Sequence, residues 1–130
     1  MSESKKQKVL IVDDDRFLLN MYSLKFQKSG FEVAIAVGGL DALTKLREGA
    51  KPDILLLDVV MPVMDGLELL ETIRKEKLVP DAKVFILSNQ NQPGDVERAK
   101  TLGITSYIVK ASSIPSEVVT EVIKVVGPQV

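Results

Sequence analysis

The chain has 130 residues, of which 45% are hydrophobic and 27% are charged, and its formal net charge is -1. These values are typical of one globular domain, and the near-neutral charge provides no general attraction to nucleic acids or membrane surfaces. The chain contains neither cysteine nor histidine, which excludes disulfides and thiol chemistry and argues against zinc catalysis and Ser/His/Asp hydrolysis.

The first eight residues are polar and contain no apolar segment. A signal peptide or a membrane anchor requires such a segment, so we expect neither, and we expect a cytoplasmic protein. The rest of the chain shows no internal repeat and no interdomain linker. The sequence therefore predicts a single domain over residues 1–130, in which residues 1–7 form a flexible tail.

Short apolar runs alternate with helix-like stretches along the chain. The predicted strands are residues 9–12, 31–36, 54–58, 84–88 and 104–109. The predicted helices run from Asp15 to Ser29, from Gly39 to Gly49, from Asp65 to Lys77, from Pro93 to Gly103, and over residues 118–126. This alternation predicts βαβ units with right-handed crossovers, and the continuous apolar runs are typical of strands buried on both faces. The predicted fold is α/β, with one doubly wound, five-stranded parallel sheet and five helices.

The spacing of apolar residues within the helices gives a second set of expectations. The first helix carries two neighbouring stripes: Phe17, Met21 and Leu24, and then Leu18, Tyr22 and Phe26. The second helix has leucines at three-residue spacing: Leu40, Leu43 and Leu46. Asp65 is placed to cap the third helix. The valines of the last helix are expected to pack in the core, with any remaining exposed stripe available to a partner.

Four of the predicted strands end in different polar residues: Asp13-Asp14-Asp15, Asp58, Ser88 and Lys110. In a parallel α/β sheet, ligands bind outside the carboxyl ends of the strands, so these residues are expected to converge. Carboxylates suit a small hard cation, whereas an ammonium and a hydroxyl suit phosphoryl oxygens. This combination predicts aspartyl phosphate chemistry.

The first acidic run allows two interpretations. Asp13 and Asp14 facing a third carboxylate would repel it unless a cation intervened, and Mg²⁺ suits such a cluster. Alternatively, the run only caps the first helix and interacts with its dipole. Asp58 closes a buried strand, where an uncompensated carboxylate is costly, and this position favours a nucleophile over a structural residue. Lys110 and Ser88, taken alone, fit a surface lysine and a turn-forming serine.

Together these motifs resemble the receiver domain of two-component response regulators (CheY-like) over essentially the whole chain. The matching segments are Val12 to Asp15, Gly39 to Leu43, Leu57 to Gly66, Ser88, and Tyr107 to Lys110. The resemblance implies a flavodoxin-like strand order of 2-1-3-4-5. It also implies that Asp58 accepts a phosphoryl group from a sensor histidine kinase or a phosphotransfer protein.

The same resemblance assigns the other site residues. It implies that Asp13 and Asp14 organise Mg²⁺, Asp14 most directly, and that Asp58 and the backbone carbonyl of Val60 complete the protein ligands. Lys110 and Ser88 would hold the phosphoryl oxygens. Ser88 and Tyr107 would form a switch pair, with the tyrosine turning inward behind the serine; the alternative for Tyr107 is an edge-strand residue with a hydrated hydroxyl.

Two positions depart from the family pattern. Ala111 follows Lys110 where the family usually has a proline after a cis peptide, and a cis bond before a residue other than proline costs about 2.5–4 kcal/mol. The residue after the switch hydroxyl is usually small, whereas here it is Asn89. The cis or trans state of the 110–111 bond, and the effect of Asn89 on the acyl phosphate, are left open by the sequence.

The leading hypothesis is a stand-alone receiver that signals through its fourth helix, fifth strand and fifth helix, as a monomer or weak dimer. The sequence leaves open that the chain is an excised part of a larger protein. Thr105-Ser106 stands where DNA-dimerising relatives tend to carry acidic residues, so no direct nucleic acid binding is expected. One alternative is a Mg²⁺-dependent phosphohydrolase of the haloacid dehalogenase type, with Asp13 as nucleophile and Asp15 as acid. Another is a receiver that binds partners without phosphorylation.

Overall fold

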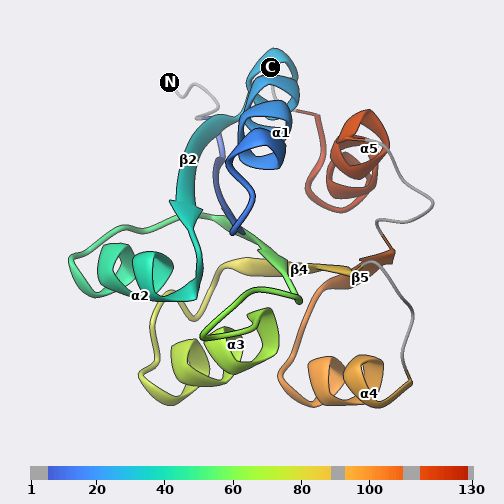
Figure 1. Ribbon diagram of the computed structural model, residues 1–130. Helices are drawn as coiled ribbons and strands as arrows, with labels where there is room; N and C mark the ends of the chain where they lie inside the picture. The colour runs from blue at the N-terminus through green and yellow to red at the C-terminus, as the bar shows by residue number, and fades with distance from the viewer. Residues whose placement is uncertain (1–5, 89–92, 110–114, 129–130) are drawn as a thin grey trace.

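The computed structural model describes residues 6–88, 93–109 and 115–128, in which strands and helices alternate along the chain (Figure 1). The strands are β1 (Lys8–Asp13), β2 (Glu32–Val37), β3 (Ile54–Asp58), β4 (Lys83–Ser88) and β5 (Ser106–Val109). The helices are α1 (Arg16–Lys28), α2 (Gly39–Arg47), α3 (Gly66–Lys75), α4 (Pro93–Thr101) and α5 (Pro115–Val126). The predicted tail lies mostly outside the described residues, although the carbonyl of Gln7 accepts a hydrogen bond from the Glu32 amide.

The five strands form one parallel sheet in the order β2-β1-β3-β4-β5, which confirms the predicted fold class and strand order. Figure 1 shows α1 and α5 on one face of the sheet and α2, α3 and α4 on the other. Because all strands run in the same direction, their carboxyl ends lie along one edge of the sheet. This edge is therefore where the predicted site residues have to be sought.

The apolar core has two layers, one on each face of the sheet. Successive residues of β3 alternate between them: Leu55 and Leu57 belong to the layer under α2 and α3, and Ile54 and Leu56 to the layer under α1 and α5. All four side chains are at most 1% exposed. Burial on both faces explains why β3 is a continuous apolar run, and its observed bounds are those predicted.

In α1 one of the two predicted apolar stripes is mostly buried and the other is largely exposed, and in α2 one of the three spaced leucines is exposed. In α1, Phe17 is 70% and Leu24 58% exposed, while Leu19, Tyr22 and Phe26 are buried. Both sets have helical spacing, so the period alone does not choose between them. In α2, Leu40 is 56% exposed. Each step of three residues turns a helix by about 300°, so Leu40 points about 120° away from Leu46.

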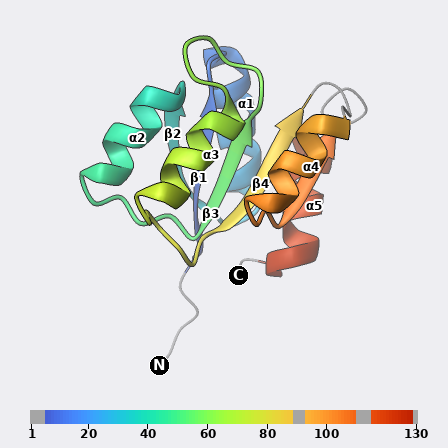
Figure 2. The same cartoon turned by 90° about the horizontal axis from the view of Figure 1, so that it is seen from below.

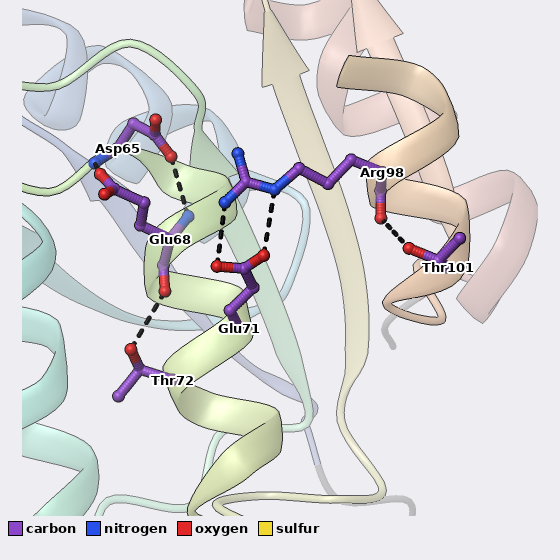
Figure 3. A network of polar contacts seen from close by, with 6 residues as sticks. All are labelled: Asp65, Glu68, Glu71, Thr72, Arg98 and Thr101. Carbon is purple, nitrogen blue, oxygen red and sulfur yellow. Dashed lines mark hydrogen bonds and ion pairs between the residues drawn. The ribbon is translucent and has the colours of Figure 1, made fainter. Parts of the chain in front are cut away.

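Helix α4 is held mainly by polar contacts with α3. Of its described side chains only Ala99 is buried. The Arg98 guanidinium pairs with both carboxylate oxygens of Glu71, at 2.9 and 3.1 Å (Figure 3). Arg74 of α3 donates to the carbonyls of Leu102 and Gly103, at 2.9 and 3.1 Å, just beyond the end of α4. These contacts fix α4 beside α3 with little apolar burial.

The start of α3 confirms the predicted cap. Asp65 accepts a hydrogen bond from the Glu68 amide at 2.8 Å, and the Glu68 carboxylate accepts one from the Asp65 amide at 3.0 Å (Figure 3). This reciprocal capping box satisfies two amides that the first turn of a helix leaves unpaired. It fixes where α3 begins, and seven residues separate this start from the end of β3.

Candidate functional site

Three polar side chains are buried in the described part of the chain, and all three lie at the carboxyl edge of the sheet. Asp13 ends β1, Asp58 ends β3 and Ser88 ends β4, with exposed fractions of 2%, 4% and 4%. The pairing of Val12 with Leu57 makes the two aspartates neighbours across adjacent strands. Burying carboxylates costs free energy, and buried ionisable groups gathered at one edge of a sheet are typical of functional sites.

Asp14 completes an acidic cluster with these two aspartates. One carboxylate oxygen from each of Asp13, Asp14 and Asp58 lies within 4.8 Å of the others. Mg²⁺ binds oxygen ligands at about 2.0–2.1 Å, which places ligand oxygens about 3–4 Å apart, and Ca²⁺ accepts slightly longer distances. Small side-chain rotations would therefore let all three carboxylates contact one hard cation. The two buried members and the exposed Asp14 form a pocket that can bind a metal.

Asp15 has a different task from its two neighbours. Its side chain accepts hydrogen bonds from the amides of Phe17 and Leu18, at 2.9 and 3.3 Å, and caps α1. Its own amide donates to the Asp13 carboxylate at 3.0 Å. The capping interpretation of the acidic run therefore holds for Asp15, whereas Asp13 and Asp14 lie in the acidic cluster, where Mg²⁺ binding stays a prediction. The haloacid dehalogenase alternative is weakened, because the residue that it needs as a general acid is an exposed helix cap.

Tyr22 lies beneath the acidic cluster, a position that the sequence pattern did not reveal. It is 2% exposed and belongs to the core layer under α1. Burial, together with the negative charges of Asp13 and Asp58, raises the pKa of Tyr22 to about 12. The phenol therefore stays neutral at physiological pH. Its helical spacing predicted a core residue, but only the three-dimensional arrangement places it within the field of two aspartates.

The backbone of Asp58 is fixed by the junction between β3 and α3. The Val59 amide donates to Leu87 in β4, and the Gly66 amide donates to the Val59 carbonyl, both at 2.9 Å. A Cβ atom at Gly66 would lie 2.2 Å from the Asp58 carbonyl oxygen, so only glycine allows this approach. In Figure 2 the loop between β3 and α3 rises beyond the tip of β3. This loop carries Val60, whose side chain is 65% exposed.

Tyr107 lies on β5 and packs against the core layer under α2 and α3. Its hydroxyl oxygen is enclosed and has no hydrogen-bond partner in the part of the chain that the structure describes. This enclosure argues against a hydrated hydroxyl, and the switch role of Tyr107 stays a prediction. Lys110, Asn89 and Ala111 fall outside the described residues, so their predicted roles and the 110–111 peptide stay predictions.

A family model described as the response regulator receiver domain matches residues 9–122. The chain belongs to this family. Its fold agrees with solved receivers: the Vibrio cholerae chemotaxis protein CheY4 superposes with a TM-score of 0.84 at 30% identity, covering 93% of this chain and 99% of that one. A CheY-like receiver domain protein from Methanospirillum hungatei gives 0.82 at 27% identity, covering 92% and 93%. The predicted family is confirmed, and with it the general role of this family, which is signalling by domains that accept phosphoryl groups.

The comparisons correct the expectation about partners. The DNA-binding response regulator MtrA of Mycobacterium bovis is 32% identical over 120 residues, which cover 92% of this chain and 50% of MtrA. The transcriptional regulatory protein PhoP of Bacillus subtilis is 33% identical, with 86% and 45% covered. The chain thus spans about half the length of these curated relatives. The prediction of no nucleic acid partner was wrong. It rested on the net charge of this domain and on residues 105–106, and neither feature reports on the further half of the DNA-binding relatives.

Membrane insertion has no support among the described helices. None of them combines the length and the apolar character that a bilayer span requires.

Proposed function

We propose that this receiver is a phosphorylation-activated switch in which Asp58 accepts a phosphoryl group from a phosphohistidine on a sensor histidine kinase. The observation that carries the proposal is the position of Asp58. It is the buried carboxylate at the end of the central strand β3, and its carboxylate lies beside those of Asp13 and Asp14. A nucleophile placed at a strand end and next to a cation site has the surroundings that phosphoryl transfer requires.

Mg²⁺ is the proposed cofactor. Asp13, Asp14 and Asp58 would hold it through carboxylate oxygens, and Val60 would add its backbone carbonyl. When bound, the ion supplies positive charge that offsets the negative charge of the phosphoryl oxygens. The fit is supported by the size of the acidic cluster and by the hard oxygen donors that form it.

In the proposed reaction an Asp58 carboxylate oxygen attacks phosphorus while the bond from phosphorus to the donor imidazole nitrogen breaks. The imidazole keeps the bonding electron pair, and the aspartyl side chain becomes a mixed anhydride. Lys110 would contact the phosphoryl oxygens with its ammonium group, and Ser88 with its hydroxyl. Hydrolysis later restores the carboxylate, so the chain is modified and reset rather than turning over a small substrate.

The relay would pass through Ser88 and Tyr107 to the surface formed by α4, β5 and α5. New phosphoryl oxygens would attract the Ser88 hydroxyl. Ser88 is the last residue of β4, and only four residues of the chain separate it from α4. The enclosed Tyr107 hydroxyl has no hydrogen-bond partner among the described residues, and such a phenol costs about 1–3 kcal/mol, which favours a second arrangement of nearby energy. By analogy with MtrA, an output on DNA through a further part of the protein belongs to the same proposal.

Intact-protein mass spectrometry with phosphoramidate tests the proposal. Wild-type protein, Asp58→Asn and Asp14→Asn are incubated with the donor, with and without Mg²⁺. We expect one phosphoryl group on the wild type only with Mg²⁺, none on Asp58→Asn, and a higher Mg²⁺ requirement for Asp14→Asn. Labelling that survives in Asp58→Asn would refute the acceptor. No labelling of any variant would leave a receiver that binds partners without phosphorylation.

A further inference from the structure

Exposed apolar side chains gather around the opening of the acidic cluster. Six large hydrophobic residues are exposed in the described part of the chain, and four of them lie near the carboxyl edge of the sheet: Phe17, Leu40, Val60 and Val63. Val60 and Val63 belong to the loop that follows Asp58, and Leu40 lies in the first turn of α2. Apolar groups concentrated on one part of a surface mark a contact site more often than scattered ones do.

Val63 is the most unusual of these residues. Its side chain is 88% exposed and its φ is 71°, in the left-handed region. A β-branched residue is rare there, and this conformation lowers the equilibrium constant for folding by about 5- to 30-fold relative to residues that tolerate it. Val79 also has a positive φ, of 36°, but it packs against the core layer under α2 and α3. Val63 belongs to neither core layer of the described residues, so its strain indicates an external contact.

Val63 lines a groove that is continuous with the acidic cluster. The groove has a volume of about 340 Å³ and lies between the first turn of α2 and the loop after β3. Leu40 and Pro62 form its apolar walls together with Val63, and Asp14 forms the wall shared with the acidic cluster. An apolar side chain seated in this groove would therefore contact the wall formed by Asp14, whose carboxylate oxygen lies within 4.8 Å of that of Asp58.

We propose that Val63 and Leu40 are the apolar anchor for the protein that donates the phosphoryl group. This inference rests on the proposed function. The donor histidine has to come within bonding distance of Asp58, so the donor surface must cover the rim of the site and exclude water from the groove. The occupant is an apolar side chain next to the phosphohistidine on the donor. Burying it there stabilises the complex and gives the strained Val63 the contact that the free chain lacks.

Val63→Asn separates this role from the chemistry, because asparagine tolerates a positive φ but offers no apolar contact. We expect the folding equilibrium constant, from urea unfolding, to rise about 5- to 30-fold. We expect labelling by phosphoramidate to stay within about twofold, because a small donor needs no anchor. For phosphotransfer from a protein donor, autophosphorylated kinase cores of the source organism are first compared, and the core that labels the wild type fastest is chosen. The second-order rate constant of transfer from this kinase should fall about tenfold in Val63→Asn.

Two further variants complete the test. Leu40→Gln should lower kinase transfer as Val63→Asn does, and Val125→Asn should not, since that valine is 45% exposed near the end of α5, away from the site. An unchanged rate of kinase transfer to Val63→Asn would overturn the anchor. The anchor would also be overturned if labelling of this variant by phosphoramidate fell as much as kinase transfer, or if the variant were less stable than the wild type. Absence of transfer from every kinase while phosphoramidate still labels Asp58 would overturn it too. Absence of phosphoramidate labelling would instead refute the proposed function.

Discussion

Gly66→Ala tests how the chain positions β3, the strand that ends in Asp58. The added Cβ would lie 2.2 Å from the Asp58 carbonyl oxygen and 2.9 Å from its carbonyl carbon. Both are backbone atoms, so no side-chain rotation relieves the overlap, and the oxygen contact has to open from 2.2 Å to at least 3.0 Å. This movement strains the hydrogen bond from the Gly66 amide to Val59 and displaces the buried first turn of α3. Overpacking and the weakened bond together should cost about 2–4 kcal/mol.

The assay is urea unfolding followed by circular dichroism, with Gly94→Ala as the matched control. Gly94 lies in α4 and a Cβ there meets nothing within 4 Å, so alanine should stabilise the protein by about 0.5–1 kcal/mol through the unfolded state. Opposite signs for the two substitutions are the expected result. If Gly66→Ala stays within about 1 kcal/mol of the wild type, the junction is less rigid than its distances imply.

Three other predictions concern the helices and the buried tyrosine. Arg74→Ala should lower the free energy of unfolding by about 1–2 kcal/mol, because it leaves two carbonyls at the end of α4 without a charged donor; unchanged urea midpoints would contradict this. Asp65→Ala should cost about 1 kcal/mol and Asp65→Asn much less, since asparagine still caps; equal losses in thermal unfolding would count against the capping box. In a Tyr107→Phe background, absorbance titration should give Tyr22 a pKa of about 12. Because this pKa is raised in the folded state, the contribution to stability is complete below about pH 10 and is lost as the pH rises toward 12; a midpoint near 10 would contradict the burial of Tyr22 beside two aspartates.

The sequence predicted β1, β3 and β4 well because these strands are buried on both faces. In β3 (Ile54–Asp58) the apolar run is continuous up to the last residue, so the pattern determines where the strand starts and ends. The polar residue that ends such a strand has to lie at the carboxyl edge of the sheet. This reasoning brought Asp13, Asp14 and Asp58 together before any coordinates. The helices were less determined, since Leu40 obeys a plausible spacing and still faces solvent.

Other features depend on contacts between distant segments, and no local pattern encodes them. Tyr22 meets the field of the aspartates only because α1 packs over β1 and β3. The close approach of Gly66 to Asp58 and the pairing of Arg98 with Glu71 depend on where α3 lies. The strain at Val63 depends on a loop conformation that the sequence does not specify. The partner prediction failed for a different reason, because it extended the charge of one domain to proteins twice its length.

The central claim is that the phosphoryl group resides on the Asp58 carboxylate. Borohydride reduction after phosphoramidate labelling, followed by peptide mapping, tests this directly, since it converts an acyl phosphate on aspartate to homoserine and leaves phosphoserine unchanged. We predict homoserine at position 58 alone, dependent on Mg²⁺. Homoserine at position 13, or a borohydride-resistant phosphate on Ser88, would contradict the account.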